Sequence, residues 1–185
     1  MALTPSTMLP LGTRATDFNL PDTTTGTLRS LNELKSPIAT VIMFICNHCP
    51  YVKLLQTRLV EVAQQYQAEK ISFIAINSND VKNYPADNPE HMKETAAEYG
   101  YTFPYLFDET QQIAKAYHAA CTPDFYIFDA NLFCVYRGRF DDATPGNNIE
   151  PTGKDLCLAL DCLLAGKEIP GEQLPSVGCN IKWKK

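Results

Sequence analysis

Two cysteines separated by two residues, Cys46 and Cys49, are the part of this sequence best suited to do chemistry. They follow an apolar run at 38–45 and precede an amphipathic pattern that starts at Pro50. This context predicts that both sulfurs lie at a helix N-terminus, where backbone N–H groups and the helix dipole favour thiolate over thiol. Because thiolates attack disulfides and peroxides, the pair indicates a redox dithiol, with Cys46 at its more exposed end.

His48 lies between the two cysteines. A cationic imidazole beside a thiolate stabilises the reduced protein and makes the disulfide more oxidising, so His48 is a candidate for tuning the pKa and the redox potential. The alternative is a solvent-facing histidine without contacts. A structural cysteine pair or half of a zinc site is also open, but the sequence has no second Cys-x-x-Cys and no His-x-x-x-His. We expect no metal and no cofactor.

The elements that must position the dithiol follow from the hydrophobic pattern. The run 38–45 is typical of a buried parallel strand. Residues 50–69 carry apolar side chains at spacings of three and four, which predicts a helix, and 71–76 predicts the next strand. This βαβ unit places the cysteines at the carboxyl end of a strand, where chemistry gathers in such sheets. Further strands are expected at 17–20, 27–30, 105–107, 125–128 and 133–136, and further helices near 89–99, 110–117 and 152–165.

We therefore expect an α/β fold in one domain, 1–185, with an irregular C-terminal tail at 167–185. Two polar loops, 80–88 and 141–153, are hypothesised to border the active site and to set specificity. The chain has 185 residues and a net charge of −5, which argues against nucleic-acid binding. It contains no long apolar run and no signal-peptide pattern, and its seven cysteines lack a disulfide-scaffold rhythm. We expect a cytoplasmic protein without a membrane partner.

Several segments together resemble the thioredoxin superfamily. Asp17-Phe18-Asn19-Leu20 resembles the N-terminal hairpin of its peroxiredoxin and TlpA-like branches, and Thr122-Pro123 resembles the Thr-cis-Pro that faces the dithiol. Residues 49–52 and 178–183 are similar to a subgroup, the peroxiredoxin-like AhpC/TSA (redoxin) proteins that carry a Cys-x-x-Cys. The resemblance extends over about 12–185.

This resemblance implies a thioredoxin-like fold, with a central mixed β-sheet flanked by helices and an N-terminal β-hairpin. It implies a thiol–disulfide oxidoreductase in cell redox homeostasis, with Cys46 as nucleophile and Cys49 as the cysteine that resolves the mixed disulfide. Thr122 and a cis Pro123 would bind the substrate by exposing the Thr122 backbone for strand-like pairing. The expected partners are protein or small-molecule disulfides or peroxides, and a thioredoxin- or glutathione-type reductant. The oligomeric state is left open.

The sequence departs from the family pattern in ways that keep alternatives open. Cys49 takes the position of the peroxide-attacking cysteine of peroxiredoxins, and Ile42 stands where they carry a proline, so a thiol peroxidase acting through Cys49 is the alternative function. Thr40 replaces the buried acid that many thioredoxins use as a proton acceptor. A copper-handling module using Cys46, His48 and Cys49 is a third hypothesis, although related copper proteins place three residues between the cysteines.

The positions of the remaining cysteines in the predicted elements suggest different roles for them. Cys121 precedes Pro123 by two residues and is either a third redox thiol or, as we favour, a small apolar filler. Cys179 lies in the tail and is a candidate resolving cysteine, unless the tail simply packs on the domain. The other three, in strand or helix patterns, are expected to be buried and inert: Cys134, Cys157 and Cys162.

Overall fold

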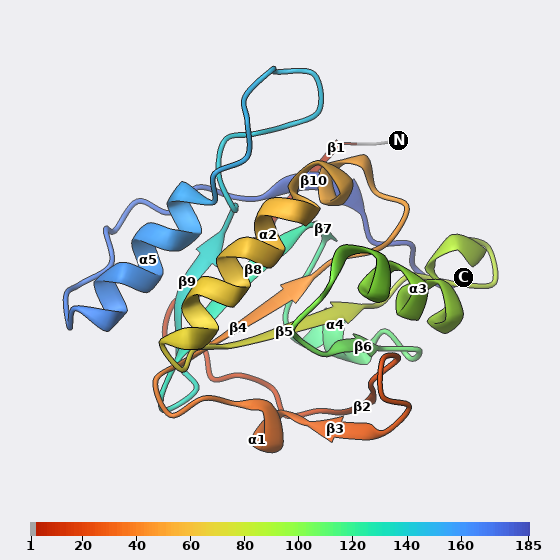
Figure 1. Ribbon diagram of the computed structural model, residues 1–185, viewed down its shortest axis with the longest axis horizontal. Helices are drawn as coiled ribbons and strands as arrows, with labels where there is room; N and C mark the ends of the chain where they lie inside the picture. The colour runs from red at the N-terminus through yellow and green to blue at the C-terminus, as the bar shows by residue number, and fades with distance from the viewer. Residues whose placement is uncertain (1–2) are drawn as a thin grey trace.

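The computed structural model describes residues 3–185 (Figure 1). Its centre is a five-stranded mixed sheet in the order β6-β5-β4-β8-β9. Strands β4, β5 and β6 are parallel to one another, whereas β8 pairs antiparallel with both β4 and β9. The expected α/β architecture with a mixed sheet is confirmed. The strands are β4 (Ala39–Phe44), β5 (Ser72–Asn77), β6 (Tyr105–Phe107), β8 (Asp124–Asp129) and β9 (Cys134–Gly138).

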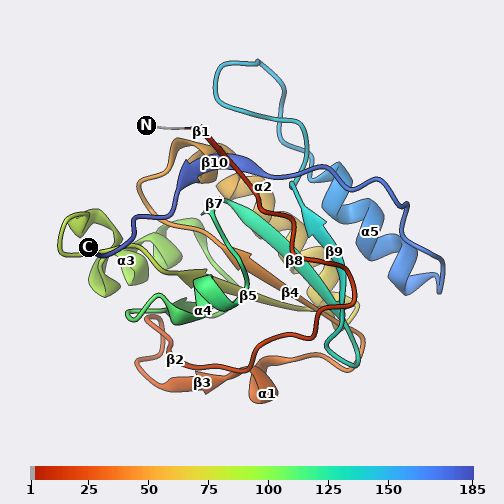
Figure 2. The same ribbon diagram turned by 180° about the vertical axis from the view of Figure 1, so that it is seen from behind.

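Helices and loops cover both faces of this sheet, which explains why β4 reads as a continuous apolar run. Alternate residues of β4 enter two different cores: Val41 and Met43 pack with the long helices, whereas Ile42 and Phe44 pack on the opposite side. One face carries α2 (Pro50–Ala68), α3 (Pro89–Tyr99) and α5 (Lys154–Leu164). The other carries α4 (Gln112–Ala116) and the N-terminal segment, as seen from behind in Figure 2.

The N-terminal β-hairpin is present as expected. It consists of β2 (Asn19–Pro21) and β3 (Leu28–Ser30), followed by the one-turn helix α1 (Leu31–Leu34). The Ser30 side chain accepts a hydrogen bond from the Glu33 N–H, and the Glu33 carboxylate accepts one from the Ser30 N–H. This capping box fixes the start of α1.

The segment 167–185 differs from the expected irregular tail, because Val177–Asn180 forms a strand, β10. Strand β10 lies between β1 (Leu3–Pro5) and β7 (Cys121–Thr122) in a three-stranded antiparallel sheet. Its backbone approaches β7 closely: a Cβ atom built on Gly178 would lie 2.0 Å from the Thr122 carbonyl oxygen. Only glycine fits here, and both ends of the described chain are thereby tied to the segment that carries Thr122-Pro123 (Figures 1 and 2).

The helices between residues 3 and 185 do not include a membrane-spanning candidate, since none combines sufficient length with sufficient apolar character.

Candidate active site

The dithiol lies in the crossover between β4 and α2, as the βαβ pattern predicts. The helix begins at Pro50 with Cys49 as its N-cap, so Cys46 lies three residues before the N-cap. The expectation that both sulfurs lie at a helix N-terminus is therefore correct for Cys49 and wrong for Cys46. Proline at the first helical position fixes this boundary, because its fixed φ suits the helix and its missing N–H would be unpaired there anyway.

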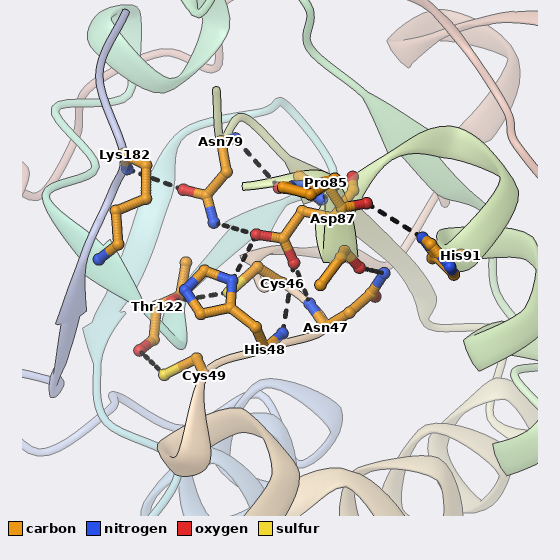
Figure 3. Close-up of polar contacts among 12 residues, drawn as sticks. Cys46, Asn47, His48, Cys49, Asn79, Pro85, Asp87, His91, Thr122 and Lys182 are labelled. Carbon is orange, nitrogen blue, oxygen red and sulfur yellow. Dashed lines mark hydrogen bonds and ion pairs between the residues drawn. The ribbon is translucent and has the colours of Figure 1, made fainter. Parts of the chain in front are cut away.

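Both cysteines are buried, so Cys46 is not open to solvent as its expected place at the exposed end of the motif requires. Cys46 is 1% exposed and Cys49 is 0% exposed. The Cys46 sulfur lies 3.4 Å from the Thr122 hydroxyl and 3.9 Å from His48 Nδ1, so a side chain from each flank covers it (Figure 3). None of the seven cysteines forms a disulfide with another.

Both thiols contact Thr122, and their pKa values move in opposite directions. The pKa of Cys49 is lowered to about 5, chiefly by the hydrogen bond from Cys46 and further by the Cys179 thiol and the backbone N–H groups of Val52 and Cys179. The pKa of Cys46 is raised, because its thiol donates to Cys49, because it is buried, and because the Asp87 carboxylate lies nearby. Cys49 is thus the acidic member of the pair.

His48 has a partner that the sequence did not reveal. Its Nδ1 lies 2.5 Å from Asp87 Oδ2, much closer than the 3.9 Å that separates it from the Cys46 sulfur. Its Nε2 is buried and has no hydrogen-bond partner among residues 3–185, and its ring stacks on Tyr84 with centroids 5.6 Å apart. An imidazolium at this position would be paired with a carboxylate, which reduces its net positive charge toward the thiol.

Asp87 is the centre of a hydrogen-bonded cradle (Figure 3). This fully buried carboxylate accepts hydrogen bonds from the backbone N–H groups of Asn47, at 2.8 Å, and His48, at 3.3 Å. It also accepts one from the Asn79 side chain at 2.8 Å. Residues 85–87 form a 3₁₀ turn that presents it to the dithiol loop. The only sequence signal for Asp87 was the polar composition of loop 80–88.

The C-terminal segment supports this cradle from the far side. The Lys182 N–H donates to Asn79 Oδ1 at 2.8 Å, which orients the amide that donates to Asp87. The Lys182 ammonium lies 5.5 Å from the ring centroid of Tyr84, within cation–π range. Segments from three parts of the chain therefore meet around His48.

Thr122 and Pro123 face the dithiol, and the peptide bond between them is cis, as the resemblance implies. The Thr122 hydroxyl contacts Cys46, and its carbonyl oxygen lies 3.2 Å from the Cys49 sulfur. The backbone of Thr122 is not open for pairing with a substrate strand in the expected way. Thr122 is 3% exposed and pairs with Cys179 of β10, so the chain itself occupies this strand edge.

The accessory cysteines fall into two groups. Cys179 is buried and pairs with Thr122, whose carbonyl oxygen contacts the Cys49 sulfur, so the structure brings Cys179 beside the dithiol. Cys121 is fully buried, its thiol lies 3.7 Å from the Pro123 carbonyl oxygen, and burial raises its pKa, which suits the expected filler. Cys134 is buried as expected, whereas Cys157 and Cys162 on α5 are partly exposed and correct that expectation.

A buried acid is present, although not at the position compared with thioredoxins. Thr40 accepts a hydrogen bond from the Ser36 N–H, and the acid is instead Asp124, directly after Pro123. The Asp124 carboxylate accepts from the Ser6 hydroxyl at 3.1 Å and the Tyr126 hydroxyl at 2.7 Å. Burial raises its pKa to about 7. No pattern in the sequence distinguishes Asp124 from the other acidic residues.

Both polar loops border the site. Loop 80–88 supplies Tyr84 and Asp87, and residues 141–144 line a pocket together with Tyr51 and Pro123.

Three donors lie within 4.8 Å of one another, namely Cys46, His48 and Asp87, so the best metal-ligand set contains Asp87 in place of the expected Cys49. The Asp87–His48 ion pair already uses two of these donors. The geometry of the whole cluster defines a buried dithiol opposite a cis-proline.

A dithiol at a strand-to-helix crossover, facing a cis-proline across a mixed sheet, defines the thioredoxin-like class. The AhpC/TSA family pattern matches residues 11–137, which is more than half of the chain, and the protein belongs to this family. No match was found among proteins with curated descriptions.

Solved structures extend the likeness to the whole chain. An uncharacterised conserved protein from Geobacillus kaustophilus is 56% identical, with a TM-score of 0.98 over 100% of this chain and 97% of that chain. A hypothetical protein from Sinorhizobium meliloti is 47% identical, with a TM-score of 0.95 over 98% of each chain. A secreted disulfide oxidoreductase from Mycobacterium tuberculosis is 16% identical, with a TM-score of 0.61 over 78% of this chain and 95% of that chain, and shares the fold.

Proposed function

We propose that this protein is a thiol–disulfide oxidoreductase whose Cys46–Cys49 dithiol cycles with a disulfide. The observation that carries the proposal is that both sulfurs meet the same residue: the Thr122 hydroxyl lies 3.4 Å from Cys46 and the Thr122 carbonyl oxygen 3.2 Å from Cys49, beside the cis Thr122–Pro123 bond. Two thiols gathered at one residue can close a disulfide without a large rearrangement. The family and the fold support redox chemistry in general, and the pairing of these two sulfurs supports this reaction.

The surroundings of the cysteines suggest an order of events. Cys46 contacts the partly exposed His48, whereas Cys49 lies behind it against the helix N-terminus and the Thr122 carbonyl. Cys46 gives its proton to the Cys49 thiolate and attacks one sulfur of a substrate disulfide, whose other sulfur leaves as a thiolate and takes a proton from water to become the first product thiol. Cys49 then loses its proton, attacks the Cys46 sulfur and releases the second product thiol. A thioredoxin- or glutathione-type reductant would reopen the Cys46–Cys49 disulfide.

The burial of both sulfurs favours small disulfides over protein disulfides as substrates. A protein disulfide would have to displace the side chains that cover Cys46, and the Thr122 edge is already paired with β10. Such a cycle needs a reducing compartment, which is consistent with our proposal of a cytoplasmic location.

The test uses reduced protein and glutathione disulfide. Wild type is expected to yield two glutathione thiols and a Cys46–Cys49 disulfide, identified by peptide mass mapping. Cys49→Ser should stop at a stable mixed disulfide on Cys46, and Cys46→Ser should not form that adduct. Cys134→Ser, which changes a buried cysteine outside the dithiol, is the matched control. Consumption of glutathione disulfide at the same rate in wild type and in the Cys46→Ser, Cys49→Ser double variant would overturn the proposal.

A thiol peroxidase is the second candidate, and the low pKa of Cys49 at a helix N-terminus favours it. In this reaction the Cys49 thiolate attacks a peroxide oxygen, the O–O bond breaks, and Cys49 becomes a sulfenic acid. Cys46 then displaces water to form the same disulfide. Arg137 and Arg139 follow β9 residue Tyr136 and are both engaged, so neither is free to polarise a peroxide: Arg139 pairs with Asp155, and Arg137 donates to Gln173 and the Leu9 carbonyl. Their engagement favours the first candidate.

Hydrogen peroxide separates the two candidates. A peroxidase would lose its thiols much faster than free cysteine does, and Cys46→Ser would accumulate a sulfenic acid on Cys49 that dimedone captures. An oxidoreductase without peroxidase activity would react at the rate of free cysteine and still pass the glutathione disulfide test.

A further inference from the structure

A third cysteine lies beside the dithiol. Cys179 is far from Cys49 in sequence, yet it pairs with Thr122, whose carbonyl oxygen lies 3.2 Å from the Cys49 sulfur. It is buried, with 2% of its surface exposed. Thr122 thus contacts both thiols of the dithiol and pairs with the strand that carries Cys179.

The backbone holds Cys179 in this place. Strand β10 pairs Cys179 with Thr122, whose carbonyl oxygen also contacts the Cys49 sulfur. The missing side chain of Gly178 lets β10 approach Thr122 and Pro123 closely. Strand β10 therefore occupies the edge at which an extended substrate was expected, and it brings a cysteine to the dithiol as such a substrate would.

We propose that Cys179 is a third redox residue, which exchanges with the Cys46–Cys49 disulfide to form a Cys49–Cys179 disulfide and to free Cys46. The inference rests on the proposed dithiol cycle and deepens it. Once freed, Cys46 attacks a second substrate disulfide, while the Cys49–Cys179 disulfide still stores the two oxidising equivalents taken from the first substrate.

The exchange is balanced within the protein. The Cys179 sulfur attacks Cys49, the bond between Cys49 and Cys46 breaks, and Cys46 leaves as a thiolate that takes up the proton lost by Cys179. One disulfide is broken and one is made, so no external oxidant or reductant is consumed. The Thr122 hydroxyl, 3.4 Å from the Cys46 sulfur, donates to the leaving thiolate.

The ionisation of Cys179 is compatible with this role. Its pKa is raised to about 12, first by burial and then by the hydrogen bond to Cys49 and the charge on Cys49. The second and third causes disappear when Cys49 is in a disulfide. The charge of Lys182 lowers the pKa of Cys179 in both states.

The decisive experiment oxidises Cys46→Ser with glutathione disulfide and maps the products by mass spectrometry. This variant keeps Cys49 and Cys179 but lacks the usual partner of Cys49. A Cys49–Cys179 disulfide is expected as the main product. With one equivalent of glutathione disulfide, wild type is expected to form the Cys46–Cys49 disulfide, and with excess it should also form the Cys49–Cys179 disulfide with one glutathione on Cys46, whereas Cys179→Ser should contain only the Cys46–Cys49 disulfide.

Three variants separate a redox role from a packing role. Cys179→Ser keeps a hydrogen-bond donor at Cys49 and Cys179→Ala removes it, while Cys121→Ser changes a buried neighbour and should retain the Cys49–Cys179 disulfide. Thermal unfolding of each variant establishes that it is folded. If wild type forms the Cys46–Cys49 disulfide but folded Cys46→Ser forms only a glutathione adduct, the third-thiol inference is wrong and the dithiol function survives. If wild type forms neither disulfide, the proposed function itself fails.

Discussion

The surroundings of Cys46 and of Cys49 differ sharply, although the two residues are only three positions apart. Cys46 lies in a loop beside His48, and His48 is paired with the buried carboxylate of Asp87 from loop 80–88, which the Asn79 amide also contacts. Cys49 lies at the start of α2, beside the Cys179 thiol and two backbone N–H groups. The first environment is built from polar side chains, and the second from a helix end and a strand.

This difference separates the pKa values of two identical side chains. The negative charge of Asp87 opposes ionisation of Cys46, while the donors around Cys49 favour it. Residue type and spacing therefore identify a dithiol, whereas the difference in acidity between its two thiols depends on groups far away in sequence.

The largest effect is expected from removing the carboxylate on the Cys46 side. Asp87→Ala leaves His48, Asn79 and two backbone N–H groups without their acceptor, and we expect a loss of about 3 kcal/mol in the free energy of unfolding. The thiolate transition of Cys49 should stay near pH 5, because Asp87 is not among its causes. Denaturant unfolding measures the first effect, with Asp142→Ala, a surface carboxylate, as the control that should change little. An Asp87→Ala variant with the same free energy of unfolding as wild type would contradict the stabilising role of the cradle around Asp87.

The next effect tests the Cys49 side. Gly178→Ala would place a Cβ atom against the Thr122 carbonyl, so β10 must shift, at a cost of about 1–3 kcal/mol. The shift should also carry Cys179 away from Cys49 and raise the pKa of Cys49. Gly171→Ala is the matched control, because its Cβ atom would meet nothing within 4 Å. Equal stability of the two variants in denaturant would show that β10 is not held as described.

A third test titrates the thiols by their thiolate ultraviolet absorbance. Wild type should ionise one thiol near pH 5, and Cys49→Ser should lose that transition. Cys46→Ala removes the largest cause of the low pKa and should move the transition upward by about one unit, a tenfold change in thiolate. Cys179→Ala removes a smaller cause and should move it less. Equal shifts would contradict the order of these contributions.

The same pKa predicts a sign for the pH dependence of stability. The folded-state pKa of Cys49 is lower than that of an unfolded thiol, so its contribution to stability is present in full above the ordinary thiol pKa. That contribution is lost as the pH falls toward 5. Between about pH 8 and about pH 5, the free energy of unfolding should therefore decline more steeply in wild type than in Cys49→Ser.

The smallest effect concerns the cover of the Cys46 side. Tyr84→Ala removes the ring that stacks on His48, which should cost about 0.5–1 kcal/mol and speed the alkylation of Cys46 by iodoacetamide. Leu158→Ala, an exposed residue of α5, is the control. Faster alkylation of Cys49 instead of Cys46 would show that Tyr84 covers the other side.

The parts of the fold that depend on local pattern were predictable. The β4 strand, helix α2 and the N-terminal hairpin each carry a hydrophobic period or turn residues that indicate their structure, and the family resemblance supplied the cis Pro123. The missed features depend on contacts distant in sequence. Asp87 is one of several polar residues in its loop, and only the fold brings it to His48. Strand β10 is four residues long and contains a glycine, so no alternation distinguishes it from a loop.

The pairing of β10 has a consequence for the order of biosynthesis. The register joins Leu3 to Cys179, which is among the most distant contacts that a chain of this length can make, and distant contacts form slowly in folding. Lys182, which orients Asn79, is made later still. A ribosome-bound chain that already contains Cys46 and Cys49 therefore lacks β10, the partner of Cys49 and the support of Asp87. The protein therefore acquires the acidic thiol of Cys49 only after residues 177–182 have been synthesised.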